Sequence, residues 1–456
     1  MFPFYRQMPS VYIKTYGCQM NERDSEAVAA QLIEKGYTLS RTEASADVIL
    51  LNTCSVRDMA EQKALHKMEV LMHETRKRRP GVVLGFLGCM AQSRGRELID
   101  RLPDVDLVVG TQKFHRTAEY LDDLMAGRRD KVVETDPEQK SEAAIREHLL
   151  NGKGRKSATA FVSIMQGCNQ YCTFCIVPYT RGEERSRTIP DVISECRELV
   201  ERGVKEITLL GQIVTSYAKR DLPVREGKSP FVQLLEAVQA IDGLERIRFT
   251  SPHPKGYGDD LVAAYGELSK LVESAHIPVQ SGSDRVLKLM HRGYSRERYL
   301  EIISKLRKAR PGIGISTDFV VGFPGETEDD FEQTLSLVRE VEFDQAYLFK
   351  YSERRDTPAA TMPDQVPQQV REGRLARLLA VVNEIGARRY ASQVGRQVQI
   401  LVEGPSKRNP ERLTGRTRCN KIVVFDGAPR HIGQVMDVKI TRAGSFTLYG
   451  EPDIVD

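Results

Sequence analysis

Short apolar, β-branched runs alternate with longer stretches of helical spacing over the first third of the chain. The runs that favour strands lie at residues 11–16, 47–51 and 82–87. The stretches that favour helices follow them at residues 22–35, 56–78 and 95–102. Because repeated strand–helix units build a right-handed parallel sheet, the pattern predicts an N-terminal parallel α/β sheet domain over residues 10–128.

A longer block with the same alternation follows a polar linker at residues 152–156. Its six candidate strands lie at residues 160–165, 206–210, 246–250, 275–279, 313–321 and 346–350. Six strand–helix units predict a partial (β/α)6 barrel over residues 154–388, with the functional side chains at the carboxyl ends of its strands.

After residue 391 the pattern changes to short alternating strands separated by turns, with the clearest runs at residues 398–402, 421–425 and 435–440. This spacing is typical of a small C-terminal β-barrel, which we expect over residues 391–454. Residues 391–450 contain ten Lys or Arg and four Asp or Glu, so this segment carries +6 although the whole chain carries only +4. A basic module on a near-neutral body indicates a polyanionic partner, and an ordinary solvated basic surface is the alternative.

The composition excludes several classes of protein. Hydrophobic residues make up 40% and charged residues 29% of the 456 positions, and no apolar run approaches the roughly 18 residues of a membrane helix. The first residues lack a signal-peptide core, and eight cysteines in so long a chain make a poor disulfide framework. Their clustering suits metal binding in a reducing compartment, so we expect a cytoplasmic protein that binds no membrane.

Cysteines follow all three predicted N-terminal strands at equivalent places, as Cys18, Cys54 and Cys89. The carboxyl ends of parallel strands meet at one edge of a sheet, where ligands gather. We therefore expect these cysteines to be neighbours in space, although each could also be an ordinary core residue. Three thiolates can hold an iron–sulfur cluster and leave one of its irons without a protein ligand.

A second group of three cysteines, Cys168, Cys172 and Cys175, follows the first strand of the central block. Thiolates spaced in this way on one loop can each bind one iron of a four-iron cubane, whereas a full set of four would make an electron carrier. Structural zinc is the alternative, but it usually takes four ligands in paired motifs, and no His follows Cys175 at that spacing. Cys196 and Cys419 share spacing with no other cysteine, so we expect ordinary free thiols there.

The loop CNQYCTFC at residues 168–175 resembles the CxxxCxφC signature of the radical S-adenosylmethionine (SAM) enzymes. The resemblance implies that the open iron binds S-adenosylmethionine and that Phe174 packs near its adenine. The motifs YGCQMN, NTCSVR and GCMAQ around the N-terminal cysteines resemble those of the radical methylthiotransferases. The first is similar to the motif of the tRNA-2-methylthio-N6-dimethylallyladenosine synthase branch. The segment after residue 391 resembles TRAM, an RNA-binding domain of tRNA-modifying enzymes.

The same resemblance supplies candidate polar contacts to S-adenosylmethionine at the ends of the barrel strands. They are Glu184, Arg187, Gln212, Gln280 and Ser283. The chain departs from the family pattern after its second strand and near its sixth. The departures are Ile213 and Thr215, where the family usually has Asn, and Arg355 and Asp356, which replace Pro-Gly.

These features predict an enzyme that adds a methylthio group to C2 of N6-isopentenyladenosine beside the anticodon of a tRNA. The resemblance implies two [4Fe–4S] clusters, at Cys168, Cys172 and Cys175 and at Cys18, Cys54 and Cys89. It also implies S-adenosylmethionine and a reducing electron donor such as a flavodoxin, and we expect a monomer. The alternatives are the same chemistry on threonylcarbamoyladenosine or a ribosomal-protein aspartate, and a non-catalytic RNA-binding protein with structural zinc.

Overall fold

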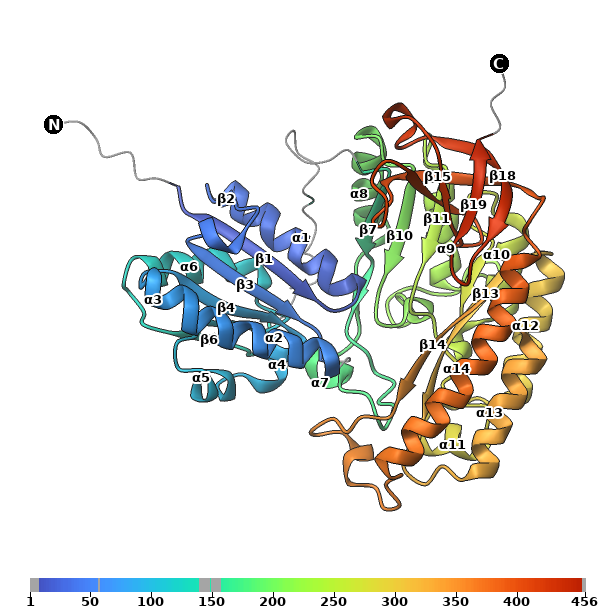
Figure 1. Cartoon of the computed structure of the whole chain (residues 1–456), viewed down its shortest axis with the longest axis horizontal. Coiled ribbons are helices and arrows are strands. Elements are labelled where there is room, and N and C mark those ends of the chain that lie inside the picture. The colour runs from blue at the N-terminus through green and yellow to red at the C-terminus, as the bar shows by residue number, and fades with distance from the viewer. Residues whose placement is uncertain (1–7, 56–57, 139–147, 149–156, 453–456) are drawn as a thin grey trace. The chain divides into compact units, whose positions relative to one another are not determined.

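The computed structural model describes residues 8–55, 58–138, 148 and 157–452, and the chain divides into two compact units (Figure 1). The first unit contains residues 1–154, 165–169 and 175–187, and the second contains residues 155–164, 170–174 and 188–456. The predicted linker at residues 152–156 lies outside the described residues. No helix among the described residues is both long and apolar enough to cross a membrane.

The first unit is built on a parallel sheet, as the sequence predicted, but the sheet has six strands and the sequence indicated three of them. Its strands are β1 (Ser10–Tyr16), β2 (Thr38–Leu39), β3 (Val48–Thr53), β4 (Val83–Gly88), β5 (Leu107–Val109) and β6 (Val132–Glu134). They lie in the order β2-β1-β3-β4-β5-β6. All six residues of β3 and of β4 are buried, because helices cover both faces of the sheet at its centre.

The helices of this unit fall on the two faces of its sheet. One buried cluster joins the sheet to α1 (Gln19–Glu34) and α6 (Thr117–Met125). The other joins it to α2 (Asp58–Val70), α4 (Cys89–Arg94) and α5 (Glu97–Arg101). The predicted helix 56–78 is divided in the structure, since a π-helical turn (Leu71–Thr75) separates α2 from α3 (Arg76–Arg78). The prediction that helix follows Cys89 only from residue 95 was wrong, because α4 begins at that cysteine.

The central block forms the predicted partial (β/α)6 barrel. Its parallel strands are β7 (Thr159–Ser163), β10 (Glu206–Leu210), β11 (Arg246–Phe249), β12 (Ser274–His276), β13 (Gly314–Val321) and β14 (Gln345–Lys350). They form two three-stranded sheets, β11-β10-β7 and β12-β13-β14, which a parallel bridge between Ile247 and Leu271 connects. Two short pieces, the pair β8 (Met165–Gln166) and β9 (Arg185–Ser186) and the helix α7 (Val177–Arg181), belong to the first unit.

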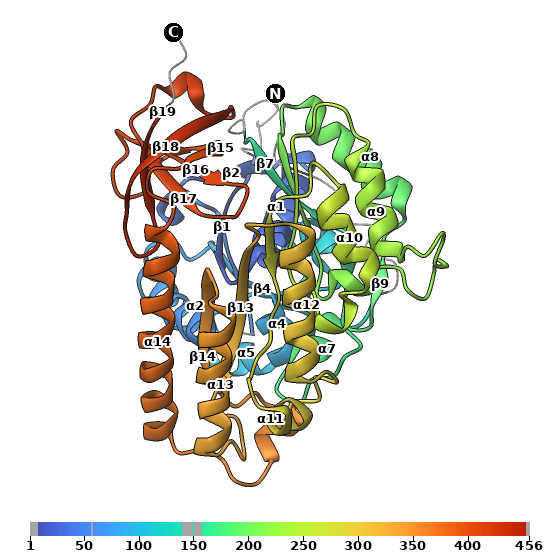
Figure 2. The ribbon, with the colours of Figure 1, turned by 90° about the vertical axis from the view of Figure 1, so that its right-hand side faces the viewer.

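Helices line the outside of this half-open barrel (Figure 2). They are α8 (Ile189–Glu201), α9 (Pro230–Gln239), α10 (Asp259–Glu267), α11 (Asp284–Leu289), α12 (Arg296–Ala309), α13 (Glu328–Val341) and α14 (Gln368–Ala391). Several begin where their sequence predicts a cap: Thr188 accepts from the Asp191 amide at α8, and Thr327 and Asp330 form a capping box at α13. Each cap ends the preceding loop at a fixed residue and thereby fixes the loop length above the barrel.

The C-terminal module is a closed five-stranded barrel, which confirms the predicted small β-barrel. Its strands are β15 (Gln397–Pro405), β16 (Leu413–Thr417), β17 (Ile422–Phe425), β18 (Val435–Ala443) and β19 (Leu448–Pro452), in the order β15-β16-β17-β19-β18. Apolar side chains from every strand fill its interior, Ile400, Val423 and Phe425 among them. The sequence pattern missed β16 and β19, whose short runs alternate small and polar residues with single apolar ones.

The small barrel is joined to the central barrel through a buried arginine at the start of β11. The side chain of Arg246 is fully buried, and burial lowers its pKa to about 10, so it remains protonated at neutral pH. It donates to the carbonyl of Arg416 at 2.8 Å and to the carbonyl of Gln399 at 3.3 Å, both in strands of the small barrel. The buried guanidinium therefore links β11 to two strands of the small barrel through their backbone carbonyls.

Two ion pairs at the same joint use basic residues of the small barrel. Lys421 Nζ lies 2.6 Å from Asp344 Oδ1, and Arg418 Nε lies 2.6 Å from Glu273 Oε2. Arg418 and Lys421 therefore hold the small barrel on the central barrel, although the sequence analysis counted both toward a basic surface.

Replacing Arg246 by Met should lower the free energy of unfolding by about 2 kcal/mol, because the joint loses its charge-assisted hydrogen bonds to two backbone carbonyls. The measurement is equilibrium urea unfolding followed by circular dichroism. Lys305→Met is the control, since Lys305 pairs with Asp259 and Glu301 in solvent and should leave the midpoint unchanged. Equal midpoints for the two variants would show that Arg246 does not stabilise this joint.

Candidate functional site

The strand register of the N-terminal sheet places its three cysteines at one level. Tyr16, Thr53 and Gly88, the last residues of β1, β3 and β4, pair across the sheet in one row. Cys54 and Cys89 directly follow two of these residues, and Cys18 comes two positions after Tyr16. The structure thus brings together residues that the sequence separates by more than 30 positions, at the edge where parallel sheets bind ligands.

Glycines allow the cysteine loops to approach one another closely. A Cβ on Gly17 would lie 2.8 Å from the Cβ of Cys54, and a Cβ on Gly88 would lie 2.3 Å from Oδ1 of Asn52. Gly88 also has φ of +96°, which other residues rarely adopt. The glycine before each of Cys18 and Cys89 is therefore a packing requirement of this edge.

Two buried asparagines fix the first of these loops. The Cys18 thiol donates to Oδ1 of Asn21 at 3.3 Å, and Nδ2 of Asn21 donates to Oδ1 of Asn52 at 3.1 Å. Nδ2 of Asn52 donates in turn to the Asn21 carbonyl at 3.0 Å. Asn21 and Asn52 lie inside the motifs that carry the cysteines, but the sequence alone gave them no role.

The electrostatic surroundings of the three thiols differ. A hydrogen bond with Cys54 lowers the pKa of Cys18 to about 6. Burial raises the pKa of Cys89, and the charge of Arg181 opposes that effect. Cys54 and Cys89 are almost fully buried, at 1% and 4% exposure. A site of this kind favours a group that replaces all three thiol protons.

The donor set fits an iron–sulfur cluster better than a single ion. Among the described residues, no group of three or more His, Cys, Asp or Glu converges closely enough to hold one metal ion. A cubane cluster has no such requirement, because each cysteine binds a different iron. Three cysteines on one edge, with no fourth cysteine in these motifs, match a cluster with one open iron.

The second cysteine loop is tied to its surroundings through its backbone. The Cys168 amide donates to the Gly182 carbonyl at 3.0 Å in the first unit. In the second unit, the amide and hydroxyl of Thr173 donate to the carbonyls of Met290 and Leu289, at 3.2 and 2.9 Å. Tyr171 has φ of 46°, a conformation that side chains other than Gly rarely adopt. Backbone hydrogen bonds thus hold each part of the loop on its own unit.

A buried arginine contacts one cysteine of this loop. Nη1 of Arg292 lies 3.3 Å from the Cys172 sulfur, while Nη2 donates to the Pro278 carbonyl at 3.1 Å and Nε donates to the Tyr294 hydroxyl at 3.1 Å. The guanidinium is 6% exposed and therefore acts in a medium of low dielectric constant. It places a buried positive charge beside the Cys172 sulfur. The sequence did not single out Arg292.

Phe174, the aromatic residue of the signature, packs at the edge of an apolar cluster. Its ring lies 6.4 Å from that of Phe323 in an edge-to-face arrangement, and Phe323 in turn contacts Tyr351. The residue is only partly buried, so part of its ring remains available to a ligand.

Two of the predicted polar contacts end barrel strands in unusual environments. Oε1 of Gln212, after β10, is buried and has no hydrogen-bonding partner among the described residues. Gln280, after β12, is 9% exposed and has φ of 74°. Unpaired buried polar atoms and strained backbone are both enriched at functional sites.

The other three predicted contacts already have partners. Glu184 accepts from the Asn169 amide at 3.3 Å, which joins it to the residue after Cys168. Arg187 is buried, at 6% exposure. The Ser283 hydroxyl caps α11 and donates to Oδ1 of Asp330 at 2.6 Å, a structural role that the sequence did not indicate.

His253 is a candidate that sequence reasoning missed. It follows β11 and is 4% exposed; its Nδ1 accepts from the Lys255 amide at 3.2 Å, and its Nε2 has no partner among the described residues. Burial and the charge of Arg292 lower its pKa, so the imidazole is neutral. The sequence signal available for this histidine was the run SPHP at residues 251–254. In the structure Ser251 of this run has φ of 56°.

The four residues that depart from the family pattern lie in ordinary structural environments. The Thr215 hydroxyl accepts from the His253 amide at 3.1 Å and so holds the loop that carries this histidine. Ile213 is buried. Arg355 and Asp356 are exposed and lie 3.8 Å apart, with Asp356 in the left-handed region at φ of 65°.

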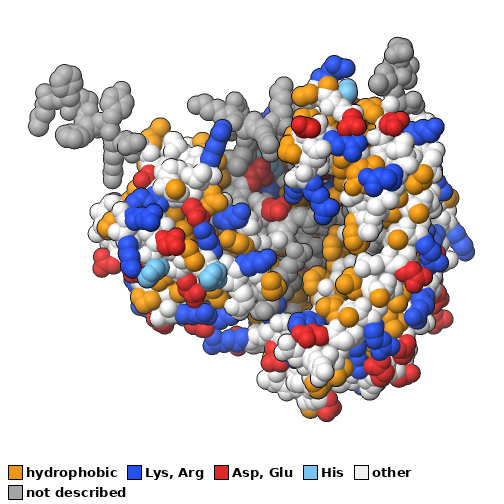
Figure 3. All heavy atoms as spheres, viewed as in Figure 1, with side chains coloured by type: hydrophobic (Ala, Val, Ile, Leu, Met, Phe, Trp, Pro, Cys, Tyr) orange, Lys and Arg blue, Asp and Glu red, His pale blue; other side chains and the backbone are white. Residues whose placement is uncertain are grey.

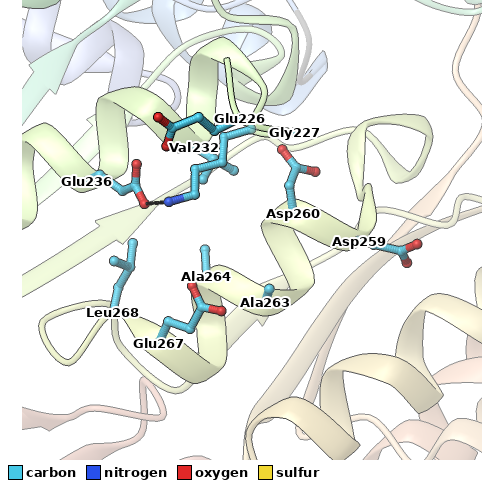
Figure 4. A pocket seen from close by; sticks show the side chains of 11 residues that line it. Glu226, Gly227, Val232, Glu236, Asp259, Asp260, Ala263, Ala264, Glu267 and Leu268 are labelled. Carbon is cyan, nitrogen blue, oxygen red and sulfur yellow. Dashed lines mark hydrogen bonds and ion pairs between the residues drawn. The ribbon is translucent and has the colours of Figure 1, made fainter. Parts of the chain in front are cut away.

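A pocket of about 280 Å³ on the outside of the central barrel is a poor candidate for this chemistry (Figure 4). Its walls come from α9, α10 and the turn before α9, and they are mainly acidic. Lys228 is paired with Glu236 there, and Asp260 accepts from the Ser229 amide at 2.8 Å, so these charges already have structural partners. Its carboxylates would repel a polyanion.

On the face shown in Figure 3, basic side chains are interspersed with acidic ones. Within the small barrel, Arg412, Arg416, Arg418 and Lys421 are used in ion pairs. Its other cations are exposed and make no ion pair with a described residue: Arg396, Lys407, Arg408, Arg430, Lys439 and Arg442. Arg442 stacks on Tyr449, with its guanidinium carbon 3.7 Å from the ring centre.

Three family models match the chain, and together they span most of it. Residues 10–110 match the Uncharacterized protein family UPF0004, residues 162–338 match the Radical SAM superfamily and residues 391–452 match the TRAM domain. Among solved structures, the radical S-adenosylmethionine methyltransferase TsrM from Kitasatospora setae has a similar fold. Its TM-score is 0.56 at 12% identity, over 78% of this chain and 74% of that chain.

Curated relatives are similar over nearly their whole length. The tRNA-2-methylthio-N(6)-dimethylallyladenosine synthase of Opitutus terrae is 53% identical, covering 97% of each chain. The enzyme of the same name from Akkermansia muciniphila is 52% identical, over 98% of this chain and 99% of that one. Similarity at this level over both lengths shows that the chain belongs to the radical SAM family of the tRNA-2-methylthio-N(6)-dimethylallyladenosine synthases.

Proposed function

We propose that the protein adds a methylthio group to C2 of N6-dimethylallyladenosine next to the anticodon of a tRNA. The observation that carries this function is the pair of cysteine sets, one at the edge of the N-terminal sheet and the other on the barrel loop. The chain that holds them is similar over nearly its whole length to tRNA-2-methylthio-N(6)-dimethylallyladenosine synthases. In the reaction the C2 hydrogen leaves and a carbon–sulfur bond forms in its place. That carbon–hydrogen bond is too strong for acid–base chemistry at neutral pH.

Each cysteine set would hold one [4Fe–4S] cluster. Cys168, Cys172 and Cys175 would hold the cluster that binds S-adenosylmethionine, and Cys18, Cys54 and Cys89 would hold the cluster that supplies sulfur. Together these groups supply a radical route for breaking the C–H bond and a sulfur atom for the new bond. The chain contributes the cysteine loops, the buried cations Arg292 and Arg181 beside them, and burial that excludes water.

Six side chains would contact S-adenosylmethionine: Phe174, Glu184, Arg187, Gln212, Gln280 and Ser283. The buried Oε1 of Gln212 and the strained backbone of Gln280 support two of these assignments most directly. Phe174 offers a partly exposed ring for the adenine. We add His253, whose unpaired Nε2 is the same kind of unused buried polar atom.

The chain would divide into three modules, at residues 10–128, 154–388 and 391–454. The last of these, the small barrel, would bind the tRNA. Its six exposed cations would contact phosphate groups of the RNA. The target base of the tRNA would leave its stack to reach the reaction site. A reducing partner such as a flavodoxin would supply electrons, and the protein would act as a monomer.

Replacing Cys172 and Cys54 separately by Ala should divide the reaction into its two parts. Cys172→Ala should abolish S-adenosylmethionine cleavage, whereas Cys54→Ala should retain cleavage and lose methylthiolation. The assay uses anaerobically reconstituted protein, a dimethylallylated anticodon stem-loop RNA and product mass. Iron analysis should give about eight irons in the parent and about four in each variant.

Cys196→Ala is the matched control, because Cys196 is buried in α8 outside both sets and should keep both activities. Methylthiolation by Cys54→Ala would contradict the assignment of the sulfur-donating cluster. One or two zinc ions without sulfide in the parent would contradict the enzyme itself.

Replacing Lys407 and Arg408 together by Ala should weaken tRNA binding and lower its dependence on salt. Each lost phosphate contact removes about one unit from the slope of log affinity against log salt concentration. The measurement is fluorescence anisotropy of labelled tRNA at several salt concentrations. Arg339→Ala, an exposed cation on α13, is the control and should leave the slope unchanged. An unchanged slope in the double variant would exclude this part of the barrel from the RNA contact.

A further inference from the structure

A buried ion pair joins helix α7 to helix α1 beside the N-terminal cysteines. Nη2 of Arg181, the last residue of α7, donates to Oδ2 of Asp24 in α1 at 2.6 Å, across 157 positions of sequence. The two side chains are 3% and 0% exposed. The Thr111 hydroxyl, after β5, donates to the Thr180 carbonyl at 2.5 Å and holds α7 on this unit, where it packs against α4 (Figure 1).

The pair leaves hydrogen-bonding capacity unused. Nη1 of Arg181 and Oδ1 of Asp24 are both buried and have no hydrogen-bonding partner among the described residues. Burial opposes the charge on Arg181, but Asp24 and the neighbouring thiols of Cys89 and Cys18 raise its pKa well above the ordinary value. A buried N–H group without a well-placed acceptor costs about 1–3 kcal/mol, so the guanidinium is suited to an anionic sulfur acceptor at this edge, where Cys89 is its neighbour.

We propose that Arg181 is a positioning residue for the iron–sulfur cluster of the N-terminal site. Its fixed guanidinium donates a hydrogen bond to anionic sulfur at this edge and provides the positive charge that raises the reduction potential of the cluster. Asp24 orients the guanidinium and offsets part of its charge. This inference rests on the proposed cluster at Cys18, Cys54 and Cys89.

The sign of each effect follows from electrostatics. The reduced cluster carries one more negative charge than the oxidised cluster, so a nearby cation stabilises it more strongly. Hydrogen bonds to cluster sulfur act in the same direction. Removing Arg181 therefore lowers the reduction potential, whereas removing the charge of Asp24 exposes the cluster to the full guanidinium charge and raises it.

The test is a redox titration with dithionite as the one-electron reductant, followed by electron paramagnetic resonance. The protein is the full chain with Cys168, Cys172 and Cys175 replaced by Ala, so that only the N-terminal cluster is titrated. Arg181→Gln should shift the midpoint to a lower potential and Asp24→Asn to a higher one. Arg181→Lys, which keeps the charge, should stay nearer the parent than Arg181→Gln.

Arg79→Gln is the matched control. Arg79 belongs to the same unit but donates to the carbonyls of Ala46 and Glu43, which precede β3 at the other end of its strand, so its variant should keep the parent midpoint. A purely structural role for Arg181 would change iron content or stability, but it would not produce shifts of opposite sign.

Iron and sulfide analysis separates the two ways in which the inference can fail. A parent without iron and sulfide would overturn the proposed N-terminal cluster, and the inference with it. A parent with a full cluster whose midpoint responds to neither Arg181→Gln nor Asp24→Asn would overturn the inference alone. If Arg181→Gln loses its cluster, Arg181→Lys and Asp24→Asn decide the question, since a parent-like midpoint in Asp24→Asn contradicts the charge effect.

Discussion

The register of the parallel N-terminal sheet is the constraint on which its candidate site depends. Parallel pairing aligns the ends of β1, β3 and β4, so a cysteine after each strand reaches the same edge. The edge can form only if the loops pass very close to one another, and Gly17 and Gly88 make that approach possible. Backbone hydrogen bonds thus determine where the thiols lie, and the asparagine network then holds them there.

A second constraint is that a buried charge needs a group of opposite charge or a hydrogen-bonding partner beside it. Both cysteine sites have a buried guanidinium nearby, from Arg292 at Cys172 and from Arg181 at Cys89. A thiolate buried with no cation would be costly, because desolvation penalises the charged form. The same principle operates at the joint between the two barrels, where the buried Arg246 donates to two backbone carbonyls and lies 4.0 Å from the carboxylate of Glu206. Arginine suits all three places because its planar group donates in several directions and remains charged.

Much of the fold was predictable because hydrophobic period and strand–helix alternation are local signals. The sheet, the partial barrel and the C-terminal barrel all follow from them, whereas three-residue strands such as β5 and β6 give too short a signal. Cysteine positions were also visible in the sequence. The pair of Asp24 and Arg181 was not, because 157 residues separate two charges that read as ordinary surface residues. The role of Lys421 was likewise hidden, because a count of charges cannot distinguish a docking cation from an exposed one.

Chain connectivity limits how far Cys175 can lie from the N-terminal cysteines. Arg181 lies beside the N-terminal cysteines and follows Cys175 by only six residues. Six residues span at most about 22 Å even when fully extended, and the helical turn of α7 shortens that reach further. This short segment therefore keeps Cys175 within a limited distance of the N-terminal cysteines through covalent bonds. Placing the buried cation on α7 therefore fixes the segment at the sheet edge and supplies charge to that edge with one side chain.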